Sequence, residues 1–343
     1  MHRWKHQLPM HDVMDSLQQA DSMYGKYGGT MQFENKQYWG VILGASSGFG
    51  LATAKKLASQ GMNICAIHRD RRGSMKRIEE DFDAIRAFGV KFLSVNTNAL
   101  DPEIRQDVLN MLQENMGEGE KVRMLLHSIA FGNLKLLAPC PDKGGQRSAR
   151  ALLAEKLGIS ADKLEAAIQD LFSVGVSRLY PLADPPLYNQ ERLASEEDFS
   201  NTIYAMGTSL LGWVQDIFSR KIFASDARVF GLTSEGNSIA WQGYAPVSAA
   251  KAVLESVSRS LAVEMAPYGI RSNIIQAGVT DTPALRHIPG HAHIASSAML
   301  KNPFKRLTRP EDVANVIALL CTEEAAWING DIIRVDGGEH VAG

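Results

Sequence analysis

The chain has 343 residues, 45% of them hydrophobic and 22% charged, with a formal net charge of -2. This near-neutral balance gives no basic footprint for nucleic acid or for an anionic membrane surface. No apolar run reaches the roughly 20 residues that span a bilayer, and the N-terminal residues lack the apolar core of a secretory signal. We therefore expect a cytoplasmic protein that binds neither nucleic acid nor membrane.

The first 37 residues carry only weak helical spacing, followed by a Gly-rich stretch. We predict that residues 1–37 form an extension that packs on the outside of the protein or on a partner chain. The three cysteines, Cys65, Cys140 and Cys321, are far apart and form no CxxC pair or disulfide framework. Reduced thiols are therefore expected.

After the extension, short apolar segments alternate with amphipathic segments. The expected strands cover residues 39–43, 63–67, 91–95, 122–127, 228–233, 271–276 and 331–335. The expected helices cover residues 51–59, 74–88, 102–115, 197–223, 246–266 and 310–321. Such alternation predicts an α/β fold, a three-layer Rossmann fold with a seven-stranded parallel sheet, in a single domain over 38–343.

The alternation pauses between about residues 134 and 196, where a helical piece (147–172) precedes a Pro-rich link (181–186). We interpret this stretch as an insertion after the fourth strand. It leaves the sheet at its carboxyl edge, where α/β folds bind ligands. A lid over the active site is the first hypothesis, and an oligomer contact is the alternative.

Three glycines, Gly44, Gly48 and Gly50, follow the first strand and open a helix. Glycines there allow a tight turn and a close approach of the backbone to a pyrophosphate, which the helix N-terminus attracts. The loop residues Ser46, Ser47 and Phe49 would then lie against the cofactor. An ordinary glycine turn is the alternative.

The end of the second strand indicates which cofactor binds. NAD enzymes usually place an acid there for the ribose hydroxyls, whereas this chain has His68 followed by Arg69. A guanidinium suits a 2′-phosphate, so we predict NADP(H). Asp70 keeps NAD(H) as the lesser alternative, and a solvated basic loop is the other.

Several of these motifs resemble the short-chain dehydrogenase/reductase superfamily. The resemblance rests on the glycine loop, on Ser234, on Lys251 and on the segment 330–338, Gly-Asp-Ile-Ile-Arg-Val-Asp-Gly-Gly. Val247 stands where ordinary members carry their catalytic tyrosine. Tyr244, seven residues before the lysine, has the spacing of the enoyl-acyl-carrier-protein reductases.

The segment 126–131, Leu-His-Ser-Ile-Ala-Phe, is likewise similar to the enoyl-reductase branch, whereas Ser234 and the glycine loop match ordinary carbonyl-reducing members. The resemblance implies a homotetramer or homodimer and a place in fatty acid biosynthesis. It also implies catalytic roles for Ser234, Tyr244 and Lys251. The cofactor contacts that it implies, beyond the glycine loop and Arg69, are Asn98, Ala99, Ser128, Ile129, Ala130, Lys251, Gly278, Thr280 and Thr282.

The expected chemistry fits these side chains. Hydride transfer to a polarised acceptor leaves negative charge on an oxygen, which needs a donor such as Tyr244. A nearby Lys251 ammonium would make the phenol a better acid and could hold the ribose hydroxyls of the cofactor. Because Pro246 is expected to begin the helix, Tyr244 should lie just outside it.

We therefore expect an NADPH-dependent enzyme that reduces the C=C bond of a small or carrier-bound enoyl thioester. The alternatives are a carbonyl reductase acting on a 3-oxoacyl thioester or another ketone, and a non-catalytic nucleotide-binding regulator. His287, His291 and His293 have a spacing that a metal could use, with Asp281 nearby. We expect a loop there, with nothing to fix the ligands, and predict no metal site.

Overall fold

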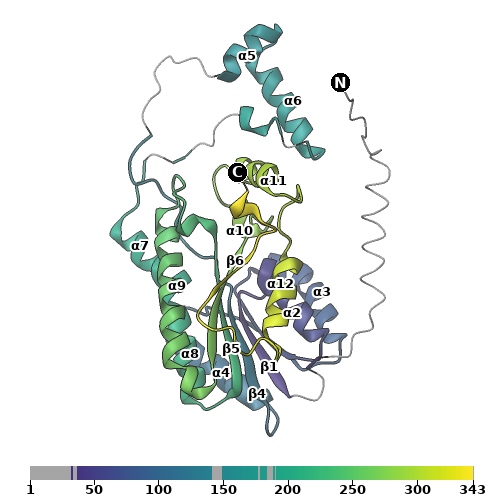
Figure 1. The fold of residues 1–343 in the computed structure, drawn as a ribbon, viewed down its shortest axis with the longest axis vertical. Coiled ribbons are helices and arrows are strands. Elements are labelled where there is room, and N and C mark those ends of the chain that lie inside the picture. The colour runs from purple at the N-terminus through teal and green to yellow at the C-terminus, as the bar shows by residue number, and fades with distance from the viewer. Residues whose placement is uncertain are drawn as a thin grey trace, which may run out of the picture.

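The computed structural model describes residues 32–33, 37–140, 149–176, 178–183, 188–189 and 191–342. The predicted extension therefore lies almost wholly outside the described residues. Within them, seven parallel strands form one sheet in the order β3-β2-β1-β4-β5-β6-β7 (Figure 1). The strands are β1 (Tyr38–Leu43), β2 (Asn63–His68), β3 (Phe92–Asn96), β4 (Lys121–His127), β5 (Phe223–Thr233), β6 (Arg271–Ala277) and β7 (Ile332–Val335). The predicted Rossmann fold is confirmed.

Helices cover both faces of the sheet, as Figure 1 shows. On one face pack α2 (Gly48–Ala58), α3 (Met75–Arg86) and α12 (Pro310–Leu320). On the other face pack α4 (Pro102–Asn115), α8 (Ser209–Ser219) and α9 (Ala245–Glu264). Along β1, Ile42 joins the first core, whereas Val41 and Leu43 join the second. This alternation follows from the two-residue period of a strand.

Two predicted helices are each interrupted. The segment predicted as one helix over 147–172 forms α5 (Ala149–Leu157) and α6 (Ala161–Ser173). Gly158 between them has a φ of +67°, which helices do not allow, and the Ser160 hydroxyl caps the N-terminus of α6.

The segment predicted as a helix over 197–223 begins with α7 (Glu196–Ile203), passes through a π-helical turn, η3 (Tyr204–Thr208), and ends with α8. Lys221 has a φ of +57°, and the chain has left the helix by that residue. Phe223 therefore begins β5, five residues earlier than predicted, and pairs with Val122 of β4.

A second difference follows β6, where we expected a loop. The chain forms α10 (Pro283–Arg286) and α11 (His291–Lys301). The Thr282 hydroxyl caps α10 by accepting a hydrogen bond from the Leu285 backbone N–H. A residue with left-handed backbone, Gly290, directly precedes α11. The glycine and proline residues of this segment had indicated a loop. Here Pro283 begins α10, and Gly290 separates the two short helices.

The insertion packs against α11. Its small core comprises Ala154, Leu164, Ile168, Tyr180 and Ala183, and Ala292 of α11 joins it. The ring of Tyr180, in the short helix η2 (Tyr180–Leu182), meets that of His293 edge to face at 4.8 Å. Figure 1 shows α5 and α6 beyond α11, at the end of the molecule opposite the label of β4. No helix in the described part of the chain is long and apolar enough to cross a membrane.

Candidate active site

Ser234, Tyr244 and Lys251 come together where β5 ends and α9 begins. Ser234 directly follows β5, and its Oγ lies 3.3 Å from the Tyr244 hydroxyl oxygen. The Lys251 Nζ donates to the Leu232 carbonyl oxygen over 2.7 Å. All three groups therefore lie at the carboxyl edge of the sheet, where a parallel α/β fold places its ligands.

Tyr244 is the residue that precedes α9, so it lies outside the helix as predicted. The helix begins one residue earlier than expected, at Ala245, with Pro246 in its first turn. Val247, where ordinary members of the superfamily carry tyrosine, is buried against Ala205 and Met206. The described helix therefore offers no hydroxyl at that position.

Gly236 makes room for the tyrosine ring, a feature that the sequence analysis did not predict. A Cβ on Gly236 would lie 2.5 Å from Cε1 of Tyr244, closer than side chains allow. The absence of a side chain thus lets the turn after β5 pass beside the ring. The position of the Tyr244 hydroxyl therefore depends on Gly236 as well as on the start of α9.

Burial dominates the electrostatics of the site. It raises the pKa of Tyr244, while the hydrogen bond to Ser234 acts in the opposite direction. Burial lowers the pKa of Lys251 to about 8, against the attraction of Glu255. The Lys251 ammonium is hydrogen-bonded to a strand carbonyl, a contact that the spacing in the sequence did not indicate.

His127 at the end of β4 is buried behind this trio. Its Nε2 lies 2.8 Å from the Ser209 Oγ at the start of α8. Burial, with the charge of Lys251, lowers the pKa of His127 to about 3. The imidazole is therefore neutral at physiological pH and links β4 to α8.

The glycine loop has the geometry that a dinucleotide requires. Gly44 and Gly48 have φ angles of +89° and +52°, and a Cβ on Gly50 would lie 2.1 Å from the Gly44 carbonyl oxygen. No side chain caps the N-terminus of α2. Its first N–H groups can therefore face a diphosphate, and the residues present fit the cofactor.

The other predicted cofactor residues also lie at the carboxyl ends of strands. Asn98 and Ala99 follow β3, and the Ala99 carbonyl accepts from Trp213 Nε1. Residues 128–130 (Ser128, Ile129 and Ala130) follow β4. Gly278, Thr280 and Thr282 follow β6. A Cβ on Gly48 would lie 3.3 Å from the Thr282 methyl, so the glycine loop and the segment after β6 are neighbours.

The segment after β2 presents exposed arginines, of which Arg69 lies nearest the strand, and an engaged acid, Asp70. Arg69 is exposed, and its guanidinium carbon lies 4.6 Å from the centre of the Phe131 ring. His68 is buried in β2, and its Nδ1 lies 2.8 Å from the Asp70 Oδ2. Asp70 thus faces His68, which leaves Arg69 as the group nearest in sequence that can meet a phosphate.

Two family descriptions match the chain. The first, "short chain dehydrogenase", matches residues 39–137, and the second, "Enoyl-(Acyl carrier protein) reductase", matches residues 184–340. The first match contains the glycine loop and the second contains Ser234, Tyr244 and Lys251. The chain belongs to the short-chain dehydrogenase/reductase superfamily. It is accordingly an oxidoreductase of a superfamily that uses a nicotinamide cofactor, and the predicted superfamily is confirmed.

Similar proteins catalyse different reactions. This short-chain dehydrogenase/reductase is 27% identical over 299 residues to "Cis-4-hydroxycyclohexanecarboxylate dehydrogenase" of Sinomonas cyclohexanicum, covering 87% of this chain and 94% of that protein. It is 23% identical over 312 residues to the 3-oxoacyl-acyl-carrier-protein reductase FabG of Escherichia coli K12, covering 91% and 100%. The structure of FabI from Candidatus Liberibacter asiaticus superposes with a TM-score of 0.65 at 20% identity, covering 92% and 98%.

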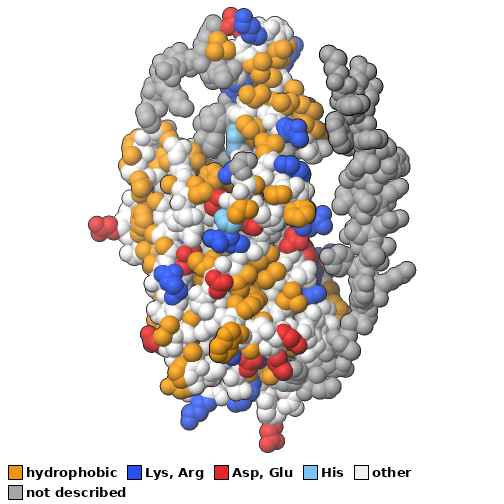
Figure 2. Space-filling view, in the orientation of Figure 1, with side chains coloured by type: hydrophobic (Ala, Val, Ile, Leu, Met, Phe, Trp, Pro, Cys, Tyr) orange, Lys and Arg blue, Asp and Glu red, His pale blue; other side chains and the backbone are white. Residues whose placement is uncertain are grey.

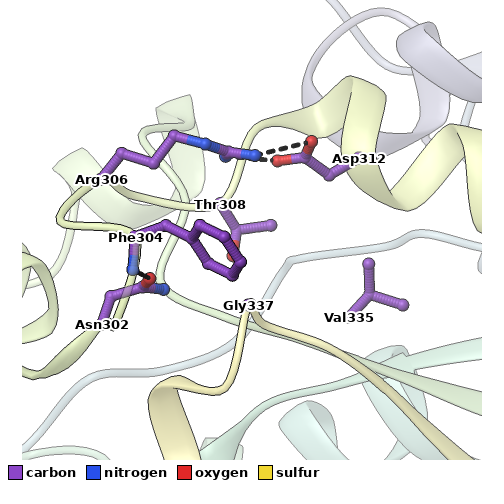
Figure 3. A pocket seen from close by; sticks show the side chains of 7 residues that line it. All are labelled: Asn302, Phe304, Arg306, Thr308, Asp312, Val335 and Gly337. Carbon is purple, nitrogen blue, oxygen red and sulfur yellow. Dashed lines mark hydrogen bonds and ion pairs between the residues drawn. The ribbon is translucent and has the colours of Figure 1, made fainter. Parts of the chain in front are cut away.

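Two further features of this short-chain dehydrogenase/reductase lie near the site. One is a hollow with a volume of about 200 Å³, whose lining side chains are drawn in Figure 3. It is lined by Asn302, Phe304, Arg306, Thr308, Asp312, Val335 and Gly337. None of the catalytic candidates lines the hollow. Thr308, which does line it, pairs with Thr280, so the hollow adjoins the predicted cofactor residues that follow β6.

The histidines after β6 form the other feature. His291 and His293 lie in α11, and His287 directly follows α10. The His293 ring meets the Tyr180 ring edge to face, and Nδ1 of His287 contacts the Pro283 carbonyl oxygen. Among the described residues, no group of three His, Cys, Asp or Glu side chains has the arrangement of a metal site.

Proposed function

We propose that this oxidoreductase reduces the C=C bond of an α,β-unsaturated acyl thioester with NADPH. One observation carries the proposal. The hydroxyls of Ser234 and Tyr244 lie 3.3 Å apart. Tyr244 lies just before α9, whereas Val247 occupies the position of the catalytic tyrosine in ordinary members of the superfamily. A tyrosine placed there favours the oxygen of an enoyl thioester as the group it meets.

When bound, NADPH supplies a hydride, which adds to the β-carbon of the substrate. The electron pair of the C=C bond moves toward the carbonyl, and the thioester oxygen gains negative charge. Tyr244 can donate a hydrogen bond or a proton to that oxygen, and Ser234 can donate a second hydrogen bond. If Tyr244 has given its proton, solvent restores it, and the enol loses its O–H proton to solvent as the α-carbon is protonated. If Tyr244 has donated only a hydrogen bond, the enolate is protonated at the α-carbon directly, and either way the saturated thioester results.

Lys251 has a different role in this proposal. Its ammonium uses one of three N–H donors on the Leu232 carbonyl, which leaves donors for the ribose hydroxyls. The lysine would therefore hold the cofactor, and through it the face that donates the hydride.

The preference for NADPH over NADH rests on the end of β2. Arg69 is exposed there, and the Asp70 carboxylate is bonded to His68. A guanidinium can bind a 2′-phosphate through two charge-assisted hydrogen bonds. The contact with His68 engages one oxygen of that carboxylate, which leaves fewer acceptor sites for ribose hydroxyls and disfavours NADH.

A carbonyl reductase is the second candidate. A serine and a tyrosine in contact can grip the oxygen of a ketone directly, and Ser234 and Tyr244 are in contact. The two curated relatives named above match over nearly their whole length and have names of enzymes that act on alcohols or ketones. A 3-oxoacyl thioester is the substrate that this second candidate would take.

The two candidates are separated by offering crotonyl and acetoacetyl thioesters with NADPH and following oxidation of the cofactor. We expect crotonyl turnover to exceed acetoacetyl turnover. Turnover of acetoacetyl thioester alone would favour the second candidate, and turnover of neither would place the substrate outside acyl-thioester chemistry.

From the resemblance to the enoyl-acyl-carrier-protein reductases we also propose that the protein is a homotetramer and acts in fatty acid biosynthesis.

A further inference from the structure

Glu255 is a buried acid that the proposed reaction does not use. It lies on α9, four residues after Lys251, and only 8% of it is exposed. Residues four apart share one face of a helix, so both charged side chains face the end of β5. Burying a carboxylate is costly unless it is hydrogen-bonded or paired.

The hydrogen bonds of Glu255 lie on both sides of Ser234. Its Oε1 accepts from the Thr233 Oγ1 at 2.5 Å and from the Asn237 Nδ2. Thr233 is the last residue of β5, and Asn237 ends the short helix η4 (Glu235–Asn237). One carboxylate oxygen therefore ties the residues before and after Ser234 to α9.

Lys251 adds a third tie, since its Nζ donates to the Leu232 carbonyl oxygen. Residues 232–237 are thus held to α9 at three points, and Tyr244 enters the same helix at its start. The backbone on both sides of Ser234 is thereby attached to the helix that directly follows Tyr244.

We propose that Glu255 is a positioning residue, which sets the Ser234–Tyr244 geometry through its two hydrogen bonds and the charge state of Lys251 through its carboxylate. This inference rests on the proposed catalytic role of the trio. It adds a residue that acts through its neighbours and has no contact with substrate.

The Glu255 carboxylate should keep the pKa of Lys251 higher than burial alone would. Burial lowers the pKa of Lys251 to about 8, and Glu255 opposes that shift. The other titratable side chain that interacts with the Lys251 charge is His127, which is neutral because its pKa is lowered to about 3. Removing the Glu255 charge should therefore lower the pKa of Lys251 further, toward neutrality.

Two substitutions separate the two parts. Glu255→Gln keeps an oxygen for Thr233 and Asn237 but removes the charge. Glu255→Asp keeps the charge but withdraws the oxygen by one methylene. The matched control is Glu264→Gln, which removes an exposed acid from the same helix.

The charge is measured by NMR titration of ¹³C-labelled lysines, with Lys251→Arg to assign the signal; this needs neither cofactor nor substrate. We expect a midpoint near 8 in the parent protein, a midpoint lower by about one unit in Glu255→Gln, and little change in Glu255→Asp or Glu264→Gln. An unchanged midpoint in Glu255→Gln would overturn the charge role, whatever substrate the enzyme takes.

The positioning is measured as kcat on whichever thioester the parent reduces, alone and combined with Ser234→Ala. We expect Glu255→Asp to lower kcat roughly 10- to 100-fold in the parent and far less in the Ser234→Ala background. Equal losses in both backgrounds, matched by a lower melting temperature, would mean a merely structural acid. Failure of both thioesters would instead count against the proposed function, while the lysine titration still decides on Glu255.

Discussion

That Ser234, Tyr244 and Lys251 lie at one end of the sheet was predictable from the sequence, because their spacing resembles that of a known superfamily. Gly236 and Glu255 were not. Nothing in the chain order indicates that a glycine eight residues before Tyr244 lies against its ring. Glu255 left a weak signal, its place one helical turn after Lys251, but acids are common on exposed helix faces. Only the structure shows that this acid is buried.

The Lys251 ammonium has a partner that the sequence did not indicate. A lysine seven residues from a tyrosine was expected to lower the pKa of the phenol. The end of β5 instead offers the Leu232 carbonyl to the lysine at 2.7 Å. A strand end brought close by the fold thus changed the partner that sequence spacing suggested.

Arg69 is tested by its effect on cofactor preference. Losing a charge-assisted pair costs about 1.5–3 kcal/mol, or roughly ten- to a hundredfold in affinity. Arg69→Ala should therefore narrow the ratio of NADPH to NADH affinity by that order, measured by cofactor fluorescence titration. Arg71→Ala, at an exposed arginine two residues on, should leave the ratio unchanged. Equal affinities for the two cofactors in the parent protein would refute the assignment.

Among the elements, the strands were predicted to within a few residues, except for the start of β5. Their alternating apolar pattern is local, so the sequence carries it. The breaks in the helices depend on single residues such as Gly158, whose backbone is left-handed. The helices after β6 were missed because they are short and rich in residues that also form loops.

The turn between β5 and α9 is tested by Gly236→Ala. The added methyl would lie 2.5 Å from the Tyr244 ring, so the ring must move. We expect a large loss of kcat, of roughly tenfold or more, with NADPH affinity close to that of the parent. Gly73→Ala is the matched control, because a Cβ there meets nothing within 4 Å. Parental turnover in Gly236→Ala would show that the ring position is unimportant.

The link between β4 and α8 predicts a pH dependence of stability. The folded pKa of His127, about 3, lies below its usual value, so between these values the unfolded chain binds a proton that the folded chain does not. The free energy of unfolding should therefore decrease as the pH is lowered through this window. At pH 5 this residue alone should make it about 2 kcal/mol smaller than at pH 7.

Urea unfolding of the parent and of His127→Asn at pH 7 and pH 5 measures this contribution. The loss on acidification should be smaller in His127→Asn by about that amount, whereas His287→Asn, at an exposed histidine, should behave like the parent. Identical losses in the parent and in His127→Asn would contradict a neutral buried imidazole.

For the whole molecule, the insertion distinguishes this chain from a plain Rossmann domain. Its helices pack on α11 through Tyr180 and His293, so it adjoins the segment that follows β6. Figure 2 shows apolar side chains on the surface at this end of the molecule, and Val174 is 74% exposed. Contiguous exposed apolar surface is typical of sites that bind a ligand or another chain. Both hypotheses for the insertion, a lid over the active site and an oligomer contact, predict such a surface.

If residues 134–196 border the substrate mouth, ligands should protect them. Limited proteolysis followed by mass spectrometry should show slower cleavage within this stretch when NADPH and an acyl thioester are both present, compared with NADPH alone. Cleavage in the turn between α4 and β4 (residues 116–120), at the opposite edge of the sheet, serves as the internal reference. Equal cleavage rates with and without the thioester would contradict a lid and leave an oligomer contact as its role.

The proposed reduction of an enoyl thioester requires Tyr244 as the donor to the thioester oxygen. The most direct measurement follows conversion of crotonyl thioester to butyryl thioester with NADPH by the parent and by Tyr244→Phe. Phenylalanine keeps the ring beside Gly236 and removes only the hydroxyl. We predict a butyryl product from the parent, a loss of kcat of roughly 100-fold or more in Tyr244→Phe, and similar NADPH affinity in both. The absence of butyryl product from the parent, or equal rates in the two proteins, would contradict the account.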